Sequence, residues 1–328
     1  MIAYLKLVRF QNLIFIAFIQ FVMQKVVLVP ILQTFGFDAN IENDMLSLLI
    51  AATVLIAAGG YVLNDYFDLK IDAINRPDKQ IVGNLISRST AMILHQVLTG
   101  LGVFFGLLLA FFTRSYTLAF IFIVVPGLLW FYSASYKRQF MIGNLVVAFI
   151  AALTILVVGI AQLALLQKEY GTLIYETPIP GQFYSWIGGF AFFAFLCTWI
   201  REIIKDLEDE KGDREMECRT MPIKWGTGKA KLFLYALIII TVTGLFLING
   251  LFIHFEGSLS IRYIIFGLAL PFAALCYLIF RAETPDDYHQ ASILTKVIMV
   301  IGILYSFAFY YLQAKTFGIS LFNIFKVQ

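Results

Sequence analysis

The sequence predicts an all-α integral membrane protein, a bundle of about nine transmembrane helices, and three observations lead to this fold class. Sixty per cent of the 328 residues are apolar, only 14% are charged, and the mean hydropathy is +0.85. These values lie far outside the range of soluble globular domains. The apolar runs are about 20 residues long, which suits a helix crossing a hydrocarbon core of about 30 Å. They also lack the alternation typical of barrel strands, so we expect helices.

Nine apolar runs divide the sequence, and each is expected to form one membrane-spanning helix. They cover residues 12–33, 45–63, 91–112, 117–136, 141–166, 185–204, 231–254, 261–280 and 292–314. No low-complexity linker separates them, so we expect residues 1–328 to form a single membrane-embedded domain.

Charged residues mark the ends of the first four spans. The first span follows Lys6 and Arg9 and lacks a small-residue cleavage site, so we interpret it as a retained helix rather than a removed signal peptide. The second leads into a charged segment, residues 64–90. The third and fourth follow, and Lys137 and Arg138 end the fourth.

The last five spans are interrupted by one expected outside loop and one charged segment. Residues 167–184, between the fifth and sixth spans, contain prolines and glycine and are expected to form a sizeable loop. The sixth span leads into the second charged segment, residues 201–231. The seventh and eighth spans follow. Lys296 lies one turn into the ninth span, and we expect its long side chain to reach toward the membrane surface.

The distribution of basic residues predicts the orientation of the bundle. With the N-terminus and the links after spans two, four, six and eight in the cytoplasm, 18 of the 24 Lys and Arg residues lie inside. This agrees with the positive-inside rule. We therefore expect a multi-pass protein of the plasma or inner membrane, if the source is prokaryotic, with both charged segments on the cytoplasmic side.

One acidic spacing occurs twice in this apolar chain. Asn64, Asp65, Asp68 and Asp72 recur 141 positions later as Lys205, Asp206, Asp209 and Asp213, and both copies read D-x-x-D-x-x-x-D. On a helix the three aspartates of each copy fall within an arc of about 60°, so each copy forms one acidic stripe. The repetition on two helices of the same direction predicts a pseudo-duplicated bundle.

Six aspartates near a membrane edge require compensating positive charge. Mg²⁺ is the expected partner, because it takes oxygen ligands from a few carboxylates and completes its shell with water and substrate phosphates. Basic residues close to the stripes are candidate substrate-binding groups: Arg76, Lys79, Lys137, Arg138, Arg201 and Lys205. Carboxylates, metal and flanking cations together suit a diphosphate. Apolar helices around them would keep water from an allylic cation formed when the diphosphate leaves.

These motifs and the nine apolar runs resemble the UbiA superfamily of intramembrane prenyltransferases over essentially the whole chain. The resemblance implies that an isoprenyl diphosphate donor is held through magnesium between the two motifs, and that its prenyl group passes to a lipophilic acceptor. It implies one metal held by Asn64, Asp68 and Asp72, with Asp65 beside them, and a second held by Asp206, Asp209 and Asp213. Asp68, Asp72, Asp209 and Asp213 are then the expected catalytic residues. Arg9-Phe10-Gln11-Asn12 resembles the start of the family's first helix, which makes Asn12 a candidate substrate contact.

The second motif, from Arg201 to Asp213, resembles the digeranylgeranylglyceryl phosphate synthase branch of that family. This implies geranylgeranyl diphosphate as donor and geranylgeranylglyceryl phosphate as acceptor. An aromatic acceptor, such as 4-hydroxybenzoate, a naphthoate or a tetrapyrrole, remains an alternative because those branches share the metal site. The sequence identifies no general base and predicts no oligomeric state.

Two other functional classes use acidic residues in membranes. A CDP-alcohol phosphotransferase would carry a D-G-x-x-A-R motif, which is not found near Asp65 or Asp206. A cation transporter would place its carboxylates near the bilayer midplane, whereas these stripes lie at one edge. The small net charge of +3 and the scattered Cys197, Cys218 and Cys276 indicate neither a nucleic-acid partner nor a zinc site.

Overall fold

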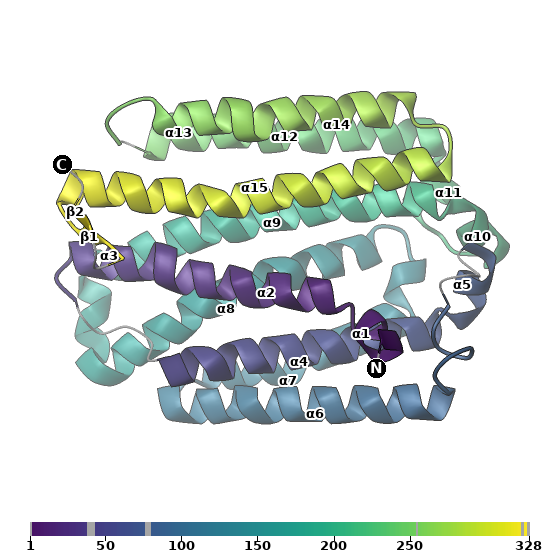
Figure 1. Cartoon of the computed structure of the whole chain (residues 1–328), viewed down its shortest axis with the longest axis horizontal. Coiled ribbons are helices and arrows are strands. Elements are labelled where there is room, and N and C mark those ends of the chain that lie inside the picture. The colour runs from purple at the N-terminus through teal and green to yellow at the C-terminus, as the bar shows by residue number, and fades with distance from the viewer. Residues whose placement is uncertain (1, 38–42, 76–79, 254, 323–324, 327–328) are drawn as a thin grey trace.

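A computed structural model describes residues 2–37, 43–75, 80–253, 255–322 and 325–326 of the chain. Within those residues nine helical segments are long and apolar enough to cross a membrane. They lie side by side as a bundle, as Figure 1 shows. Their bounds are Phe10–Thr34, Asn43–Phe67, Arg88–Thr113, Tyr116–Ala134, Ile142–Glu176, Ile179–Glu208, Thr227–Phe252, Leu259–Arg281 and Pro285–Phe317. All nine expected spans are confirmed.

Several spans consist of more than one element, and short helices connect them. The first span joins α2 (Phe10–Val22), η1 (Met23–Leu28) and α3 (Val29–Thr34), and the eighth joins α13 (Leu259–Arg262), η5 (Tyr263–Ala269) and α14 (Leu270–Arg281). The other spans are α4 (Asn43–Phe67), α6 (Arg88–Thr113), α7 (Tyr116–Ala134), α8 (Ile142–Tyr170) with η4 (Gly171–Glu176), α9 (Ile179–Glu208), α12 (Thr227–Phe252) and α15 (Pro285–Phe317). The short helices are α1 (Ile2–Leu7), α5 (Leu69–Asn75), η3 (Tyr136–Arg138), α10 (Glu210–Glu215) and α11 (Met221–Trp225). A two-residue strand pair, β1 (Ser320–Leu321) and β2 (Phe325–Lys326), follows α15.

The expected outside loop at residues 167–184 was wrong, because most of this segment is helical. The helix α8 continues to Tyr170, η4 follows directly, and α9 already begins at Ile179. Pro180 lies in the first turn of α9, where a missing backbone N–H breaks no helical hydrogen bond. Proline therefore begins a helix here instead of marking a loop.

Wide π-helical turns allow two spans to contain an internal proline. The η1 segment precedes Pro30, and η5 precedes Pro271. In each case the residue before the proline donates its N–H five residues back, Val29 to Gln24 and Leu270 to Ile265. The wider turn leaves room for the proline ring, so the helical span continues without a break.

Glycine permits close packing of α6 on α4, the helix that carries the first stripe. The helix α4 packs along α6, and a Cβ added at Gly102 of α6 would lie 2.9 Å from the carbonyl oxygen of Ala52 in α4. Small residues at such contacts let two membrane helices approach closely. The helix α9, which carries the second stripe, packs against α8, α12 and α15 and is the most deeply buried span.

Both acidic stripes lie where a long helix meets a short one. In Figure 1 the junctions α4–α5 and α9–α10 lie at the end of the bundle that also holds α1, and the C-terminus lies at the other end. The short helices α5 and α10 are in contact with each other. Near them, buried Leu7, Val82 and Ile86 hold α1 and residues 80–87 against α4 and α6. Pro222 lies in the first turn of α11.

Candidate active site

A cavity of about 1090 Å³ opens beside the two junctions. Every aspartate of both stripes lines it, together with Asn64: Asp65, Asp68, Asp72, Asp206, Asp209 and Asp213. Its remaining wall is largely apolar and includes Ile19, Ile56, Phe122, Leu129 and Ile155. One cavity therefore combines an acidic end with an apolar interior.

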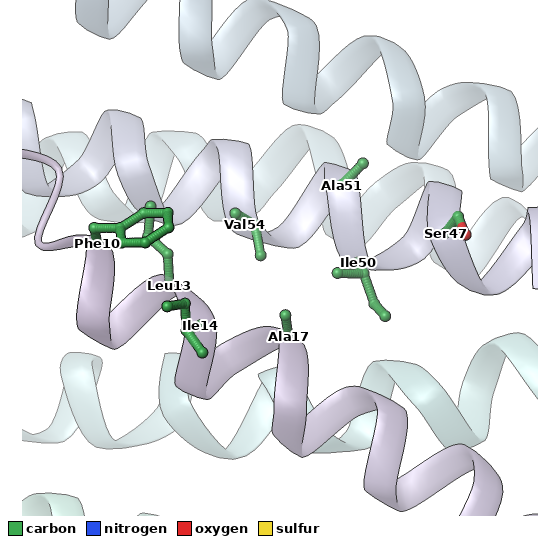
Figure 2. Close-up of a pocket in the computed structure, with 8 residues that line it drawn as sticks. All are labelled: Phe10, Leu13, Ile14, Ala17, Ser47, Ile50, Ala51 and Val54. Atoms are coloured by element: carbon green, nitrogen blue, oxygen red, sulfur yellow. The ribbon is translucent and has the colours of Figure 1, made fainter. Parts of the chain in front are cut away.

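A smaller pocket of about 380 Å³ lies between α2 and α4. Figure 2 shows that apolar side chains from both helices line it, and that Ser47 is its one polar residue. It contains no acid, base or cation. The larger cavity is therefore the candidate site.

The two stripes have the same backbone construction. Asp68 is the single residue between α4 and α5, and Asp209 is the single residue between α9 and α10. Helical hydrogen bonds continue through both junctions: the N–H of Asp72 donates to the Asp68 carbonyl at 2.8 Å, and that of Asp213 donates to the Asp209 carbonyl at 3.1 Å. The aspartates of each copy thus stay on one face, as the helical spacing predicts.

In each copy a protein partner holds the first aspartate. Asp65 forms an ion pair with Arg9 at 3.0 Å, and the Arg9 guanidinium also lies 4.9 Å from the centre of the Tyr61 ring. Asp206 accepts a hydrogen bond of 2.8 Å from the Asn144 amide. These contacts fix the first carboxylate of each copy at the cavity wall.

Lys137 lies between the two stripes. Its ammonium forms an ion pair with Asp68 and lies 3.4 Å from the Asn64 amide oxygen, while the Asn64 amide nitrogen donates to Asp68 at 2.6 Å. It also interacts electrostatically with Asp72 and Asp213. Burial lowers the pKa of Lys137, although Asp68 opposes this shift.

A glycine positions the backbone of Lys137. A Cβ added at Gly143 in α8 would lie only 2.6 Å from the Lys137 Cα and 2.8 Å from the Tyr136 carbonyl oxygen. Glycine at this point allows η3 to lie directly on the start of α8. The Lys137 ammonium can therefore reach the first stripe.

The environment of Asp213 shows that the two stripes are close. Burial and the neighbouring Asp209 carboxylate raise the pKa of Asp213 to about 6, and Asp68 of the other stripe adds to the rise. Carboxylates that repel one another across a shared space bind cations readily.

The other expected substrate contacts have different surroundings. Arg201 and Lys205 share one buried carboxylate, Glu202, at 2.9 and 3.1 Å. Both line the cavity, as do Arg138 and Asn12, and the Asn12 amide donates to the Tyr61 hydroxyl at 3.4 Å. Arg76 and Lys79 lie outside the described residues.

The donor set of the cavity suits magnesium. Asp68, Asp72, Asp209 and Asp213 offer carboxylate oxygens and Asn64 an amide oxygen, and Mg²⁺ prefers such ligands. Within the described residues no three acidic, histidine or cysteine side chains converge as a complete metal site. An ion bound here would need further ligands from water and a bound phosphate.

Sequence reasoning assigned no stripe partner to Arg9, Asn144 or Glu202. Asn144 is a polar residue near the start of an apolar span. Glu202 directly follows Arg201 and precedes Lys205 by three residues. Those patterns could have drawn attention to both residues. The pairs Arg9–Asp65 and Asn144–Asp206 join distant segments, so no local pattern predicts them.

Comparisons with known proteins show which family and which fold the chain resembles. The profile of the UbiA prenyltransferase family matches residues 27–296. The digeranylgeranylglyceryl phosphate synthase of Methanosphaera stadtmanae is 31% identical over 264 residues, which cover 80% of this chain and 86% of that protein. A solved digeranylgeranylglyceryl phosphate synthase structure has a TM-score of 0.60 at 22% identity, with 93% and 98% of the two chains covered. A UbiA homologue from Archaeoglobus fulgidus, bound to GPP and Mg²⁺, has a TM-score of 0.53 at 15% identity, with 93% and 99% covered. The two structures show a shared fold.

Proposed function

Because this chain belongs to the UbiA prenyltransferase family, we propose that it transfers a geranylgeranyl group from geranylgeranyl diphosphate to geranylgeranylglyceryl phosphate. The observation that carries the proposal is the single cavity with both acidic stripes at one end and apolar walls beyond. The synthase relative supports the choice of donor and acceptor. Family membership favours a prenyltransferase over the phosphotransferase and the transporter considered from sequence.

The proposal gives the stripe residues the task of holding the donor's diphosphate. Asp68 and Asp72 on one side, and Asp209 and Asp213 on the other, would hold magnesium, with Asn64 beside the first pair. When bound, the metal would supply Lewis-acid neutralisation of the departing diphosphate. Asp65 and Asp206, engaged by Arg9 and Asn144, are assigned to positioning the stripes.

Cationic and apolar side chains would serve the rest of the donor. Lys137 and Arg138 line the cavity and would contact diphosphate oxygens, Lys137 exchanging its ion pair with Asp68 for this contact. Phe15, Phe122 and Tyr132 line the wall that would surround the prenyl chain. Aromatic faces stabilise nearby cations, and an apolar wall excludes water.

The reaction replaces one bond to C1 of the donor by another and releases one proton from the acceptor. The C1–O bond of the donor breaks, and its electron pair leaves with the diphosphate. The acceptor's hydroxyl oxygen then bonds to C1 of the allylic cation, and its proton is released to complete the ether. The distribution of basic residues in the links supports a site at the cytoplasmic face of the membrane.

The test is to incubate the purified protein with radiolabelled geranylgeranyl diphosphate and separate acceptors, with Mg²⁺ or with EDTA. We expect a labelled diether lipid from geranylgeranylglyceryl phosphate, formed only with Mg²⁺. Prenylation of 4-hydroxybenzoate in preference to the lipid phosphate would assign the chain to an aromatic-prenylating activity instead. Turnover unaffected by EDTA would contradict the metal assignment.

A further inference from the structure

A second group of positive charges lines the cavity apart from the Lys137 ion pair. Arg201 and Lys205 come from α9, Lys296 from α15, and Arg9 from the residue before α2. Lys296 interacts electrostatically with the other three cations and with Glu202. Four basic side chains from three segments thus share one side of the cavity.

The carboxylates in this group do not balance its cations. Glu202 is shared by Arg201 and Lys205, and Asp65 pairs with Arg9. Among the described residues no ion pair involves Lys296, and the buried Arg201 Nε has no hydrogen-bond partner. Two carboxylates against four cations leave two positive charges. Asp206 also lies near Lys205 but accepts a hydrogen bond from Asn144, and counting it still leaves a surplus.

Lys296 and Arg9 are exposed and Arg201 and Lys205 are half-buried, so the surplus positive charge faces the open cavity, where an anionic ligand would neutralise it. A phosphate monoester carries a charge of about −1.5 to −2 at neutral pH and three acceptor oxygens. Its charge is therefore close to a surplus of one to two positive charges, and its oxygens suit guanidinium and ammonium donors. The membrane-surface role expected for Lys296 from sequence does not account for its place in the cavity wall among three other cations.

We propose that Arg201, Lys205 and Lys296 bind the phosphate of the acceptor, in a subsite separate from that of the donor's diphosphate. This inference rests on the proposed function. Lys205 precedes Asp209 by one helical turn and Arg201 by two, or about 6 and 12 Å along α9. The acceptor phosphate would thus lie next to the diphosphate, with its glycerol hydroxyl near the donor carbon.

Steady-state kinetics of Lys296→Met test the subsite, with Lys315→Met as the matched control. Lys296 and Lys315 are both exposed lysines on α15, and only Lys296 lines the cavity. We expect Lys296→Met to raise KM for geranylgeranylglyceryl phosphate at least tenfold and to leave KM for geranylgeranyl diphosphate within twofold. Lys296→Arg should restore most of the loss, and Lys315→Met should resemble wild type.

A second acceptor, geranylgeranylglycerol, isolates the phosphate contact. Wild type should prefer the phosphorylated acceptor strongly. Lys296→Met should lose most of that preference, because removing the phosphate from the acceptor and removing the ammonium from Lys296 abolish the same contact. A Lys296→Met enzyme that keeps the full preference, or that loses affinity equally for the donor, would overturn the subsite. If wild type prenylates neither glycerol lipid, the proposed function itself fails.

Direct binding separates affinity from turnover. Tritiated geranylgeranylglyceryl phosphate, added without donor or Mg²⁺, should bind wild type and Lys315→Met equally and Lys296→Met at least tenfold more weakly. Equal binding by all three proteins would refute the assignment of Lys296.

Discussion

Individual side chains have corresponding roles in the two acidic copies. The first aspartate is held by the protein, Asp65 by Arg9 and Asp206 by Asn144, while Asp68 and Asp209 occupy the helix junctions. The sequence predicted the stripes because a local spacing repeats, and it predicted Lys137 because of its place at a span end. It did not predict which partner each aspartate has, since Arg9, Lys137 and Asn144 lie far away in the chain from Asp65, Asp68 and Asp206.

Replacing the middle aspartate of either copy should abolish most activity. Asp68→Asn and Asp209→Asn each keep the side-chain shape but remove a negative charge, and we expect kcat to fall by about 10²–10³-fold, the usual loss of one electrostatic contact to a transition state. Asp286→Asn, at an exposed position on α15, is the control and should leave kcat unchanged. A folded Asp68→Asn protein with wild-type turnover would contradict the assignment.

The raised pKa of Asp213 should make the metal-free protein sensitive to pH. Since its pKa of about 6 exceeds the unfolded value of 3.8, the folded state binds this proton more tightly. The resulting stabilisation is complete below pH 3.8 and is lost as pH rises through about 6. In EDTA, the Tm of wild type relative to that of Asp213→Asn should therefore fall between pH 5 and pH 7. Parallel Tm profiles would show that Asp213 has no such shift.

At the scale of helices, hydropathy located all nine spans but underestimated the length of every span except the fourth. The expected spans 185–204 and 292–314 are Ile179–Glu208 and Pro285–Phe317 in the structure. Apolar runs mark the hydrocarbon core, whereas helices continue into the polar interface. The same limitation caused residues 167–184 to be expected as a loop. The π turns before Pro30 and Pro271 also left no local signal beyond the prolines themselves.

The contact between α4 and α6 should depend on Gly102. An added methyl group would lie 2.9 Å from the Ala52 carbonyl oxygen, so we expect Gly102→Ala to destabilise the protein by about 1–3 kcal/mol. A Cβ added at Gly100, on the same helix, would meet nothing within 4 Å. Thermal unfolding in detergent should thus show a lower Tm for Gly102→Ala and no loss for Gly100→Ala. Equal Tm values for the two variants would mean that the close packing of α6 on α4 at Gly102 does not contribute to stability.

Gly143→Ala should affect the site through the backbone of Lys137. Because the methyl group would collide with the Lys137 Cα, η3 must shift and weaken the reach of the ammonium toward the first stripe. We expect KM for the donor to rise severalfold, while Gly127→Ala, which meets nothing within 4 Å, leaves it unchanged. An unaltered donor KM in Gly143→Ala would show that Lys137 does not require this close packing.

At the scale of the whole molecule, two similar helix junctions meet at one end of the bundle and enclose one cavity. The repeated motif predicted this arrangement, because two stripes on helices of one direction lie at the same membrane face. The size of the cavity and the unbalanced cations around Glu202 depend on how α2, α9 and α15 pack, and no sequence pattern predicts that packing.

The predicted orientation can be measured by cysteine labelling. Glu283 is exposed between α14 and α15, and Thr172 is exposed between α8 and α9, on the opposite side of the expected topology. In intact cells a membrane-impermeant maleimide should label Thr172→Cys but not Glu283→Cys, and lysis should expose both. Native Cys197 and Cys218 are buried, and the half-buried Cys276 is replaced by Ser in both variants to keep background labelling low. Labelling of Glu283→Cys in intact cells would reverse the assigned cytoplasmic face.

We propose above all that both stripes together bind one diphosphate. The most direct measurement is an experimental structure with Mg²⁺ and the unreactive thiolo analogue of geranylgeranyl diphosphate. We predict a single diphosphate between Asp68 and Asp72 on one side and Asp209 and Asp213 on the other, with the prenyl chain along the apolar wall. A diphosphate bound to only one stripe, or outside the cavity, would contradict the account.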